Sequence, residues 1–178
     1  MGNMVTITIS GTPGSGKSTV AEILGDRLDI KYVYSGMIFR QQAKKYNMSL
    51  EEFGIYCEKN SEIDKELDNR QLDILKKGDV ILEGRLAGWL AHLNKIPAFK
   101  VAIDTDLEIR AKRIVKREQG DIEKRKKEIL KRERSEATRY KKYYNIDLKN
   151  TSIYDIVINS GDKTPEEIVS IIIEKLNE

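Results

Sequence analysis

The segment GTPGSGKST, residues 11–19, has the residue types and the spacing of a loop that surrounds a phosphate group. It fits the pattern G-x-x-x-x-G-K-[ST] at Gly11, Gly16, Lys17 and Ser18. The β-branched run VTITI precedes the loop, and apolar residues at helical spacing follow it. The loop therefore lies between a predicted strand and a predicted helix, which is the position that a nucleotide-binding loop of this kind requires.

Each part of this loop has its own role toward a nucleoside triphosphate. Gly14 and Gly16 can adopt backbone conformations that other residues avoid, so successive N–H groups can face an anion. Lys17 would place its charge on the β- and γ-phosphates, and the Ser18 hydroxyl would bind Mg²⁺. We expect ATP or GTP with Mg²⁺ to bind here. The residues expected to contact this nucleotide are Gly11, Thr12, Pro13, Gly14, Ser15, Gly16, Lys17, Ser18 and Thr19.

The composition argues against several other classes of protein. Charged residues make up 34% of the 178 residues, but the net charge is only +3, so the basic excess of a protein that coats nucleic acid is missing. Cys57 is the only cysteine, which rules out an internal disulfide and a cysteine-based metal cluster. No apolar run approaches the length of a membrane span, and we expect no signal peptide before the first predicted strand. We expect a cytoplasmic monomer that binds neither nucleic acid nor membrane.

Strands and helices alternate along the chain. Short apolar runs predict strands at residues 5–9, 31–34, 79–83, 99–103 and 155–159. Polar residues indicate where four of the helices begin: Ser35 as a cap, Ser49 with Glu52, Ser61 with Asp64, and Thr164 with Glu167. Apolar stripes predict two further helices, at residues 17–28 and from Leu107 onward.

This alternation predicts an α/β fold of three layers, in which helices cover both faces of a five-stranded parallel sheet. The strand at residues 79–83 is expected beside the strand at residues 5–9. No linker divides the chain, so residues 1–178 are expected to form a single domain.

Charged residues at other strand ends distinguish between two classes of nucleotide-binding protein. A regulatory GTPase would need a guanine-binding N-K-x-D element, and the chain has none. A small-molecule kinase needs a second anion site beside the γ-phosphate. Arg40 and Arg85 follow the second and third predicted strands and are candidates for it, because ligands bind at the carboxyl ends of parallel strands. Glu83, at the end of its strand, could hold hydrated Mg²⁺.

Four segments carry a resemblance to a known family. They are SGMIFR at residues 35–40, EGR at 83–85, IRAKRI at 109–114 and RERSEATR at 132–139. Together they resemble the nucleoside monophosphate kinases, and most closely the cytidylate kinases of the short, archaeal-type form, over nearly the whole chain. The resemblance implies the P-loop kinase fold, with a core at residues 1–34, 78–117 and 150–178, a helical acceptor-binding insert at 35–77, and a lid with the catalytic helix at 118–145.

The resemblance also implies roles for individual residues. The implied catalytic residues are Lys17, Arg85, Arg132 and Arg139. Arg113 and Arg117 would lie near ATP, and Ser18 and Glu83 would hold the metal ion. Ser61 and Arg70 match a pair with which bacterial members bind cytosine. The implied substrate-binding residues are Ser35, Gly36, Arg40, Ser61, Arg70, Gly84, Arg85, Arg132, Glu136 and Arg139. Bacterial members carry an aspartate where Leu86 stands here, so one acceptor contact is missing or replaced.

The basic run from Lys112 to Lys142 has fourteen Lys and Arg against six Asp and Glu. We interpret most of it as a solvated helix pair from which Arg132 and Arg139 are the exceptions. The resemblance implies ATP-dependent phosphorylation of CMP and dCMP as the activity. Two alternatives remain at this point: a kinase for UMP, AMP or another small acceptor, and a P-loop ATPase or switch that acts through a protein or RNA partner.

Overall fold

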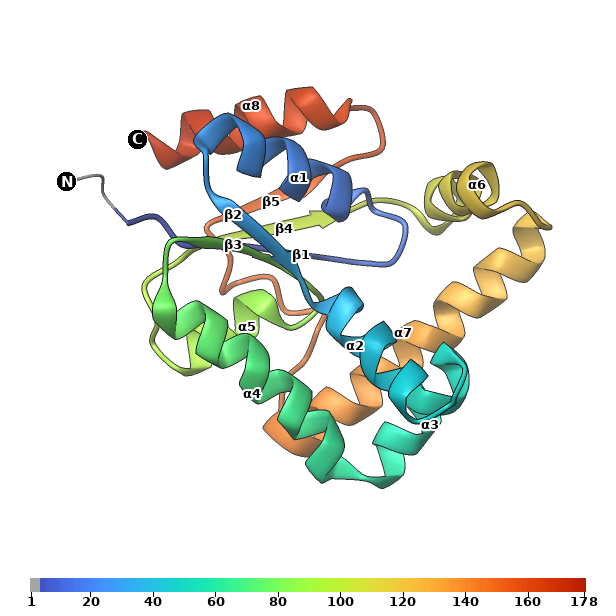
Figure 1. The fold of residues 1–178 in the computed structure, drawn as a ribbon. Helices are drawn as coiled ribbons and strands as arrows, with labels where there is room; N and C mark the ends of the chain where they lie inside the picture. The colour runs from blue at the N-terminus through green and yellow to red at the C-terminus, as the bar shows by residue number, and fades with distance from the viewer. Residues whose placement is uncertain (1–3) are drawn as a thin grey trace.

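The computed structural model describes residues 4–178, and residues 1–3 of the predicted core lie outside this part. A parallel sheet is sandwiched between helices (Figure 1). Its strands are β1 (Ile7–Gly11), β2 (Lys31–Tyr34), β3 (Val80–Glu83), β4 (Phe99–Asp104) and β5 (Ile156–Asn159). The helices within the described residues are α1 (Lys17–Leu28), α2 (Ser35–Lys45), α3 (Leu50–Lys59), α4 (Ser61–Lys77), α5 (Ala87–Leu93), α6 (Leu107–Glu118), α7 (Ile122–Tyr144) and α8 (Pro165–Leu176).

The sheet order is β2-β3-β1-β4-β5, with every neighbouring pair parallel. The predicted α/β class and the predicted pairing of β3 with β1 are therefore confirmed. In Figure 1, α1 and α8 lie together on one face of the sheet, and α4 and α5 lie on the other. α2, α3, α6 and α7 gather toward the end at which the arrow of β4 points, which is where parallel strands place their ligands.

Two apolar clusters hold these layers together. The first lies between the sheet and helices α1 and α8, and its largest fully buried side chains include Ile7, Ile9 and Leu24. The second lies on the opposite face, where Leu82 packs with Trp89 and other residues of α5. Because both faces of β1 and β3 are covered, these strands are buried at nearly every position, including the polar residues Thr8 and Ser10 of β1. No helix within residues 4–178 is both long enough and apolar enough to cross a membrane.

The predicted helix starts are partly right. Ser49 with Glu52 and Thr164 with Glu167 form the expected capping boxes. Ser35 does not cap α2, because β2 runs directly into the helix and Tyr34 occupies the cap position. Nor does Ser61 pair with Asp64 at the start of α4. Ser61 is already the first helical residue, after Asn60, and the Asp64 side chain points to another helix.

Buried polar contacts join α4 to the C-terminal half of α7. Asp64 Oδ2 accepts a hydrogen bond from Arg139 Nε at 2.9 Å, and Asp68 Oδ2 accepts one from Tyr144 Oη at 2.6 Å. Asp68 is 4% exposed. Burial raises its pKa to about 7, and the nearby Asp64 adds to the rise, whereas Tyr144 and Arg139 oppose it. The folded chain therefore keeps a proton on Asp68 over a pH range in which an unfolded chain has lost it.

Asp68→Asn tests this interface. The unfolded chain loses the Asp68 proton near pH 4 and the folded chain near pH 7, so the contribution of Asp68 to stability falls as the pH rises between these values. Asparagine carries no charge and can still accept from Tyr144. We expect the variant to match the wild type near pH 4 and to exceed it by about 2–4 kcal/mol in free energy of unfolding at pH 8. Urea unfolding at several pH values measures this difference.

Asp73→Asn on the exposed side of α4 is the control and should show no such pH dependence. A difference between Asp68→Asn and the wild type that stays constant from pH 4 to pH 8 would contradict the expectation.

Candidate active site

The phosphate loop connects β1 to α1, and its backbone requires glycine. Gly14 and Gly16 have φ of +81° and +92°, the left-handed region that glycine adopts without strain. A Cβ on Gly11 would lie 2.3 Å from the carbonyl oxygen of Ile103, and one on Gly14 would lie 2.9 Å from that of Arg110. The loop is therefore packed closely against neighbouring backbone, in the conformation from which α1 begins at Lys17.

Lys17 lies at the base of this loop in a charged environment. Its Nζ lies 3.8 Å from Glu83 Oε1 and donates to the carbonyl of Thr12 at 3.4 Å. Burial lowers its pKa to about 8, Glu83 counteracts this fall, and Arg132 and Arg85 add to it. The charges of Arg85, after β3, and Arg132, on α7, are thus close enough to affect the ionisation of Lys17.

Ser18 and Glu83, the two residues predicted for the metal, are in contact. Ser18 Oγ donates to Glu83 Oε2 at 3.0 Å, and Glu83 is 3% exposed at the end of β3. A hydroxyl and a carboxylate are the hard oxygen ligands that suit Mg²⁺, which usually keeps waters and binds substrate phosphates as well. Among residues 4–178, no three acidic, histidine or cysteine side chains cluster as a separate metal site. The pair therefore fits an ion that arrives with a nucleotide.

Asp104 is a carboxylate at this edge that the sequence analysis missed. It ends β4 on the other side of β1, accepts a hydrogen bond from Thr12 Oγ1, and accepts a second from the Thr105 N–H at 2.8 Å. An acidic residue at the end of an apolar run, as in FKVAID, is the signal that could have identified it. Asp104 thus contacts the phosphate loop from the β4 side.

Glu136 of α7 is held between two of the predicted arginines. Its Oε2 lies 2.5 Å from Arg85 Nε, and its Oε1 lies 3.0 Å from Arg132 Nε. Burial alone would raise the Glu136 pKa, but the charges of Arg85 and Arg132 outweigh it and hold that pKa below its ordinary value. Glu136 is therefore an ionised, 5% exposed carboxylate. Arg132 remains 55% exposed, and its charge contributes to the lowered pKa of Lys17.

Arg139 lies on the same helix but contacts α4 and α2. It is 5% exposed, and its Nη1 donates to Ser135 Oγ at 2.8 Å while its Nε pairs with Asp64. Its guanidinium also lies over the rings of Tyr140 and Phe39, 5.5 and 6.0 Å from their centroids. Arg139 and Arg132 thus flank Glu136 but have different partners.

Two arginines of α6 donate hydrogen bonds to the phosphate loop. Arg113 donates to the Ser15 carbonyl at 3.1 Å and also to Ser160, in the turn after β5. Arg110 is 7% exposed and donates to the Pro13 carbonyl at 3.3 Å and to Glu133 Oε1 at 2.7 Å. The sequence analysis did not assign a role to Arg110.

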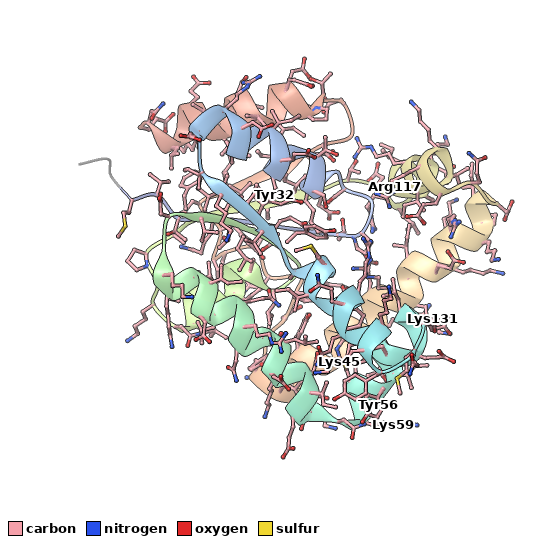
Figure 2. All side chains as sticks on the ribbon, in the orientation of Figure 1. Tyr32, Lys45, Tyr56, Lys59, Arg117 and Lys131 are labelled. Carbon is pink, nitrogen blue, oxygen red and sulfur yellow. The ribbon has the colours of Figure 1, made fainter. Side chains whose placement is uncertain are left out.

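Arg117, predicted near ATP, lies on α6 at the surface (Figure 2), where it is 65% exposed and pairs with its neighbour Glu118. Arg113 therefore lies at the phosphate loop, whereas Arg117 faces solvent.

At the ends of β2 and β3, Ser35 and Gly84 are directly apposed. A Cβ on Gly84 would lie 1.9 Å from Ser35 Oγ, so only glycine fits there. Gly36 follows at the start of α2. Arg40 is exposed on the same helix and forms no ion pair within residues 4–178. The ends of β2 and β3 therefore bring together Ser35, Gly36, Gly84 and Arg85, with Arg40 nearby on α2.

Ser61 and Arg70 do not converge. Both belong to α4, which is one continuous helix. Nine residues correspond to two and a half turns, about 13.5 Å along the axis, so the two side chains leave opposite sides of the helix. Arg70 is about half exposed and pairs with Glu66 at 3.4 Å. Their joint role in binding a base stays a prediction, and this helix geometry gives it no support.

Comparisons with known proteins identify the family of this chain. A model of the cytidylate kinase-like family matches residues 6–162. A cytidylate kinase of Methanocaldococcus jannaschii is 44% identical over 93% of this chain and 94% of its own. One from Archaeoglobus fulgidus is 45% identical over 94% and 92%, respectively.

A solved structure shows the fold. The shikimate kinase of Bacteroides thetaiotaomicron superposes with a TM-score of 0.66 at 14% identity, over 98% of this chain and 99% of its own. The arrangement is therefore that of a P-loop kinase. Because the family model spans most of the chain and the relatives align over nearly their full length, the chain belongs to the cytidylate kinase-like family, among the nucleoside monophosphate kinases.

Proposed function

We propose that this protein transfers the γ-phosphoryl group of ATP to the phosphate of CMP, and to that of dCMP, forming the nucleoside diphosphate and ADP. The observation that carries the proposal is the group of charges between the phosphate loop and α7. Lys17 stands on the loop side, Arg85 and Arg132 stand on the other, and Glu83 and Glu136 hold them in place. Such an arrangement suits two phosphate groups that must approach each other despite their negative charges.

The donor side follows from the loop. The backbone N–H groups from Gly14 to Ser18 and the N-terminus of α1 would bind the β- and γ-phosphates, and Lys17 would bridge them. Ser18 and Glu83 would hold Mg²⁺, which when bound neutralises charge on the transferring phosphate. Arg113 and Arg110 would keep the loop in its binding conformation, because they already fix two of its carbonyls.

The acceptor side follows from the ends of β2 and β3. Arg40, Arg85 and Arg132 would bind the CMP phosphate, with Ser35, Gly36 and Gly84 forming the floor of the site. Glu136 orients Arg85 and Arg132 through its two oxygens. Arg139, paired with Asp64, would position the insert against α7.

No general base is needed for the transfer, because the acceptor phosphate is already ionised at neutral pH. An oxygen of the CMP phosphate attacks the γ-phosphorus, the bond from that phosphorus to the β–γ bridging oxygen breaks, and ADP leaves with the electron pair. Lys17 and Arg132 stabilise the charge on the transferring group, and Arg85 holds the attacking phosphate in line. In this proposal residues 35–77 form the acceptor insert and residues 118–145 form the lid with its catalytic helix.

A coupled assay across monophosphates tests the proposed function. With MgATP, we expect kcat/KM for CMP to exceed that for UMP by roughly ten- to a hundredfold. On one edge, cytosine presents an amine donor and a ring-nitrogen acceptor where uracil presents a carbonyl acceptor and an N–H donor. A site that pairs with cytosine therefore leaves a buried polar group unpaired when uracil binds. dCMP should be a substrate, and AMP should be poor because a purine is larger than the site. UMP or AMP as the best acceptor would overturn the assignment of CMP. ATP hydrolysis that proceeds equally without any acceptor would overturn the kinase itself.

Lys17→Ala separates activity from stability. Loss of its charge at the transferring phosphate should lower kcat by roughly 10²–10³-fold, about 3–4 kcal/mol. The pKa of Lys17 is lowered to about 8 in the folded protein, so at pH 7 the folded state bears a penalty for its charge that the unfolded state lacks. The free energy of unfolding at pH 7 should therefore not fall. Steady-state kinetics and urea unfolding measure the two quantities.

Lys45→Ala, at an exposed position on α2 (Figure 2), is the matched control and should change neither quantity. A folded Lys17→Ala variant with near-normal kcat would refute the role of the lysine.

A further inference from the structure

One buried polar side chain beside the acceptor site has no partner. The buried face of α4 carries Asp64, Asp68 and Gln71 among leucines. Arg139 satisfies Asp64, and Tyr144 satisfies Asp68. Gln71 is 6% exposed, and its Oε1 accepts no hydrogen bond from any of residues 4–178. A buried carbonyl oxygen without a donor is unusual in a folded protein, because burial removes the water that would otherwise satisfy it.

Gln71 Oε1 lies beside the floor of the proposed acceptor site. The point where a Cβ of Gly84 would lie is 3.6 Å from Gln71 Oε1 and 1.9 Å from Ser35 Oγ. Gly84 itself stands between Glu83, which contacts Ser18, and Arg85, which contacts Glu136. Gln71 is therefore adjacent to the acceptor side of the charged group, at the end of the insert that meets the sheet.

Neither of the residues predicted to bind the base has this position. Arg70 precedes Gln71 by one residue and is therefore turned by about 100° around the helix, toward solvent and Glu66. Ser61 begins α4, about 15 Å along its axis from Gln71.

We propose that Gln71 determines the specificity for the acceptor base, with its Oε1 accepting a hydrogen bond from the exocyclic amine of cytosine. This rests on the proposed function. The amine is a donor, which is what the unpartnered oxygen lacks. Uracil presents a carbonyl at the same position of the ring, so two acceptors would face each other in a buried site. Gln71 would then contribute to the preference for CMP over UMP that a kinase for cytosine nucleotides requires.

Variants at residue 71 test this proposal through the ratio of kcat/KM for CMP to that for UMP, at saturating MgATP. Gln71→Met removes both polar atoms at similar size. It should lower kcat/KM for CMP at least tenfold, leave that for UMP within about threefold, and leave the KM for ATP unchanged. Gln71→Glu keeps the shape and an oxygen acceptor, so its CMP/UMP ratio should equal or exceed that of the wild type.

Asn69→Met is the matched control, because it removes an exposed amide from the same helix. It should change kcat/KM for neither CMP nor UMP. Thermal unfolding of each variant shows which of them fold. If Gln71→Met does not fold, Gln71→Glu decides the matter, and a ratio below that of the wild type overturns the proposal. Equal losses for CMP and UMP in Gln71→Met would also overturn it, because they would indicate a structural role alone.

Arg70→Met examines the other candidate on the helix. If the ratio of kcat/KM for CMP to that for UMP falls in Arg70→Met but is unchanged in Gln71→Met, Arg70 recognises the base. That result would overturn the role of Gln71. The wild-type panel is measured first. A wild type that does not prefer CMP overturns the proposed function, and this proposal with it. A wild type that prefers CMP, with Gln71→Met unchanged, overturns only the role of Gln71.

Discussion

A carboxylate buried among arginines determines how α7 lies against the sheet. Glu136 pairs through one oxygen with Arg85, at the end of β3, and through the other with Arg132, one turn earlier on its own helix. A buried charge must be paired, and removing one partner of such a pair is strongly destabilising, by about 3–5 kcal/mol. The helix therefore cannot slide or rotate without exposing or isolating that charge. As a result, two arginines stay at the carboxyl ends of the strands, opposite the lysine of the phosphate loop.

The same helix contacts three parts of the molecule at successive turns. Glu133 pairs with Arg110, which holds a phosphate-loop carbonyl. Glu136, three residues later, pairs with the arginine after β3, and Arg139, three further on, pairs with Asp64 of the insert. Residues three apart lie on neighbouring parts of one helix face. A movement of α7 would therefore act on the proposed donor side and the proposed acceptor side together, which is what a reaction between two bound nucleotides needs.

The sequence was sufficient to predict the layers and the phosphate loop, because hydrophobic periodicity and glycine spacing are local signals. It could not predict which partner each arginine takes. The basic run shows that charges are present but not which of them are buried. Arg113 was expected near ATP, but its hydrogen bond to the Ser15 carbonyl can be seen only in the structure. Asp68 and Gln71 resemble solvated helix residues in the sequence, since polar side chains at helical spacing usually face water. Asp68 meets Tyr144 of α7, 76 residues later in the chain, and Gln71 lies buried beside Gly84, which follows β3.

In the proposed function, Arg85 and Glu136 act as one unit toward the acceptor phosphate. A double-mutant cycle on phosphoryl transfer from MgATP to CMP, with Arg85→Met, Glu136→Gln and the double variant, measures their coupling directly. If they act together, each single substitution should cost nearly as much activation free energy as both, with a coupling of about 2 kcal/mol or more. Costs that add to within about 0.5 kcal/mol would show two independent residues and would contradict this account.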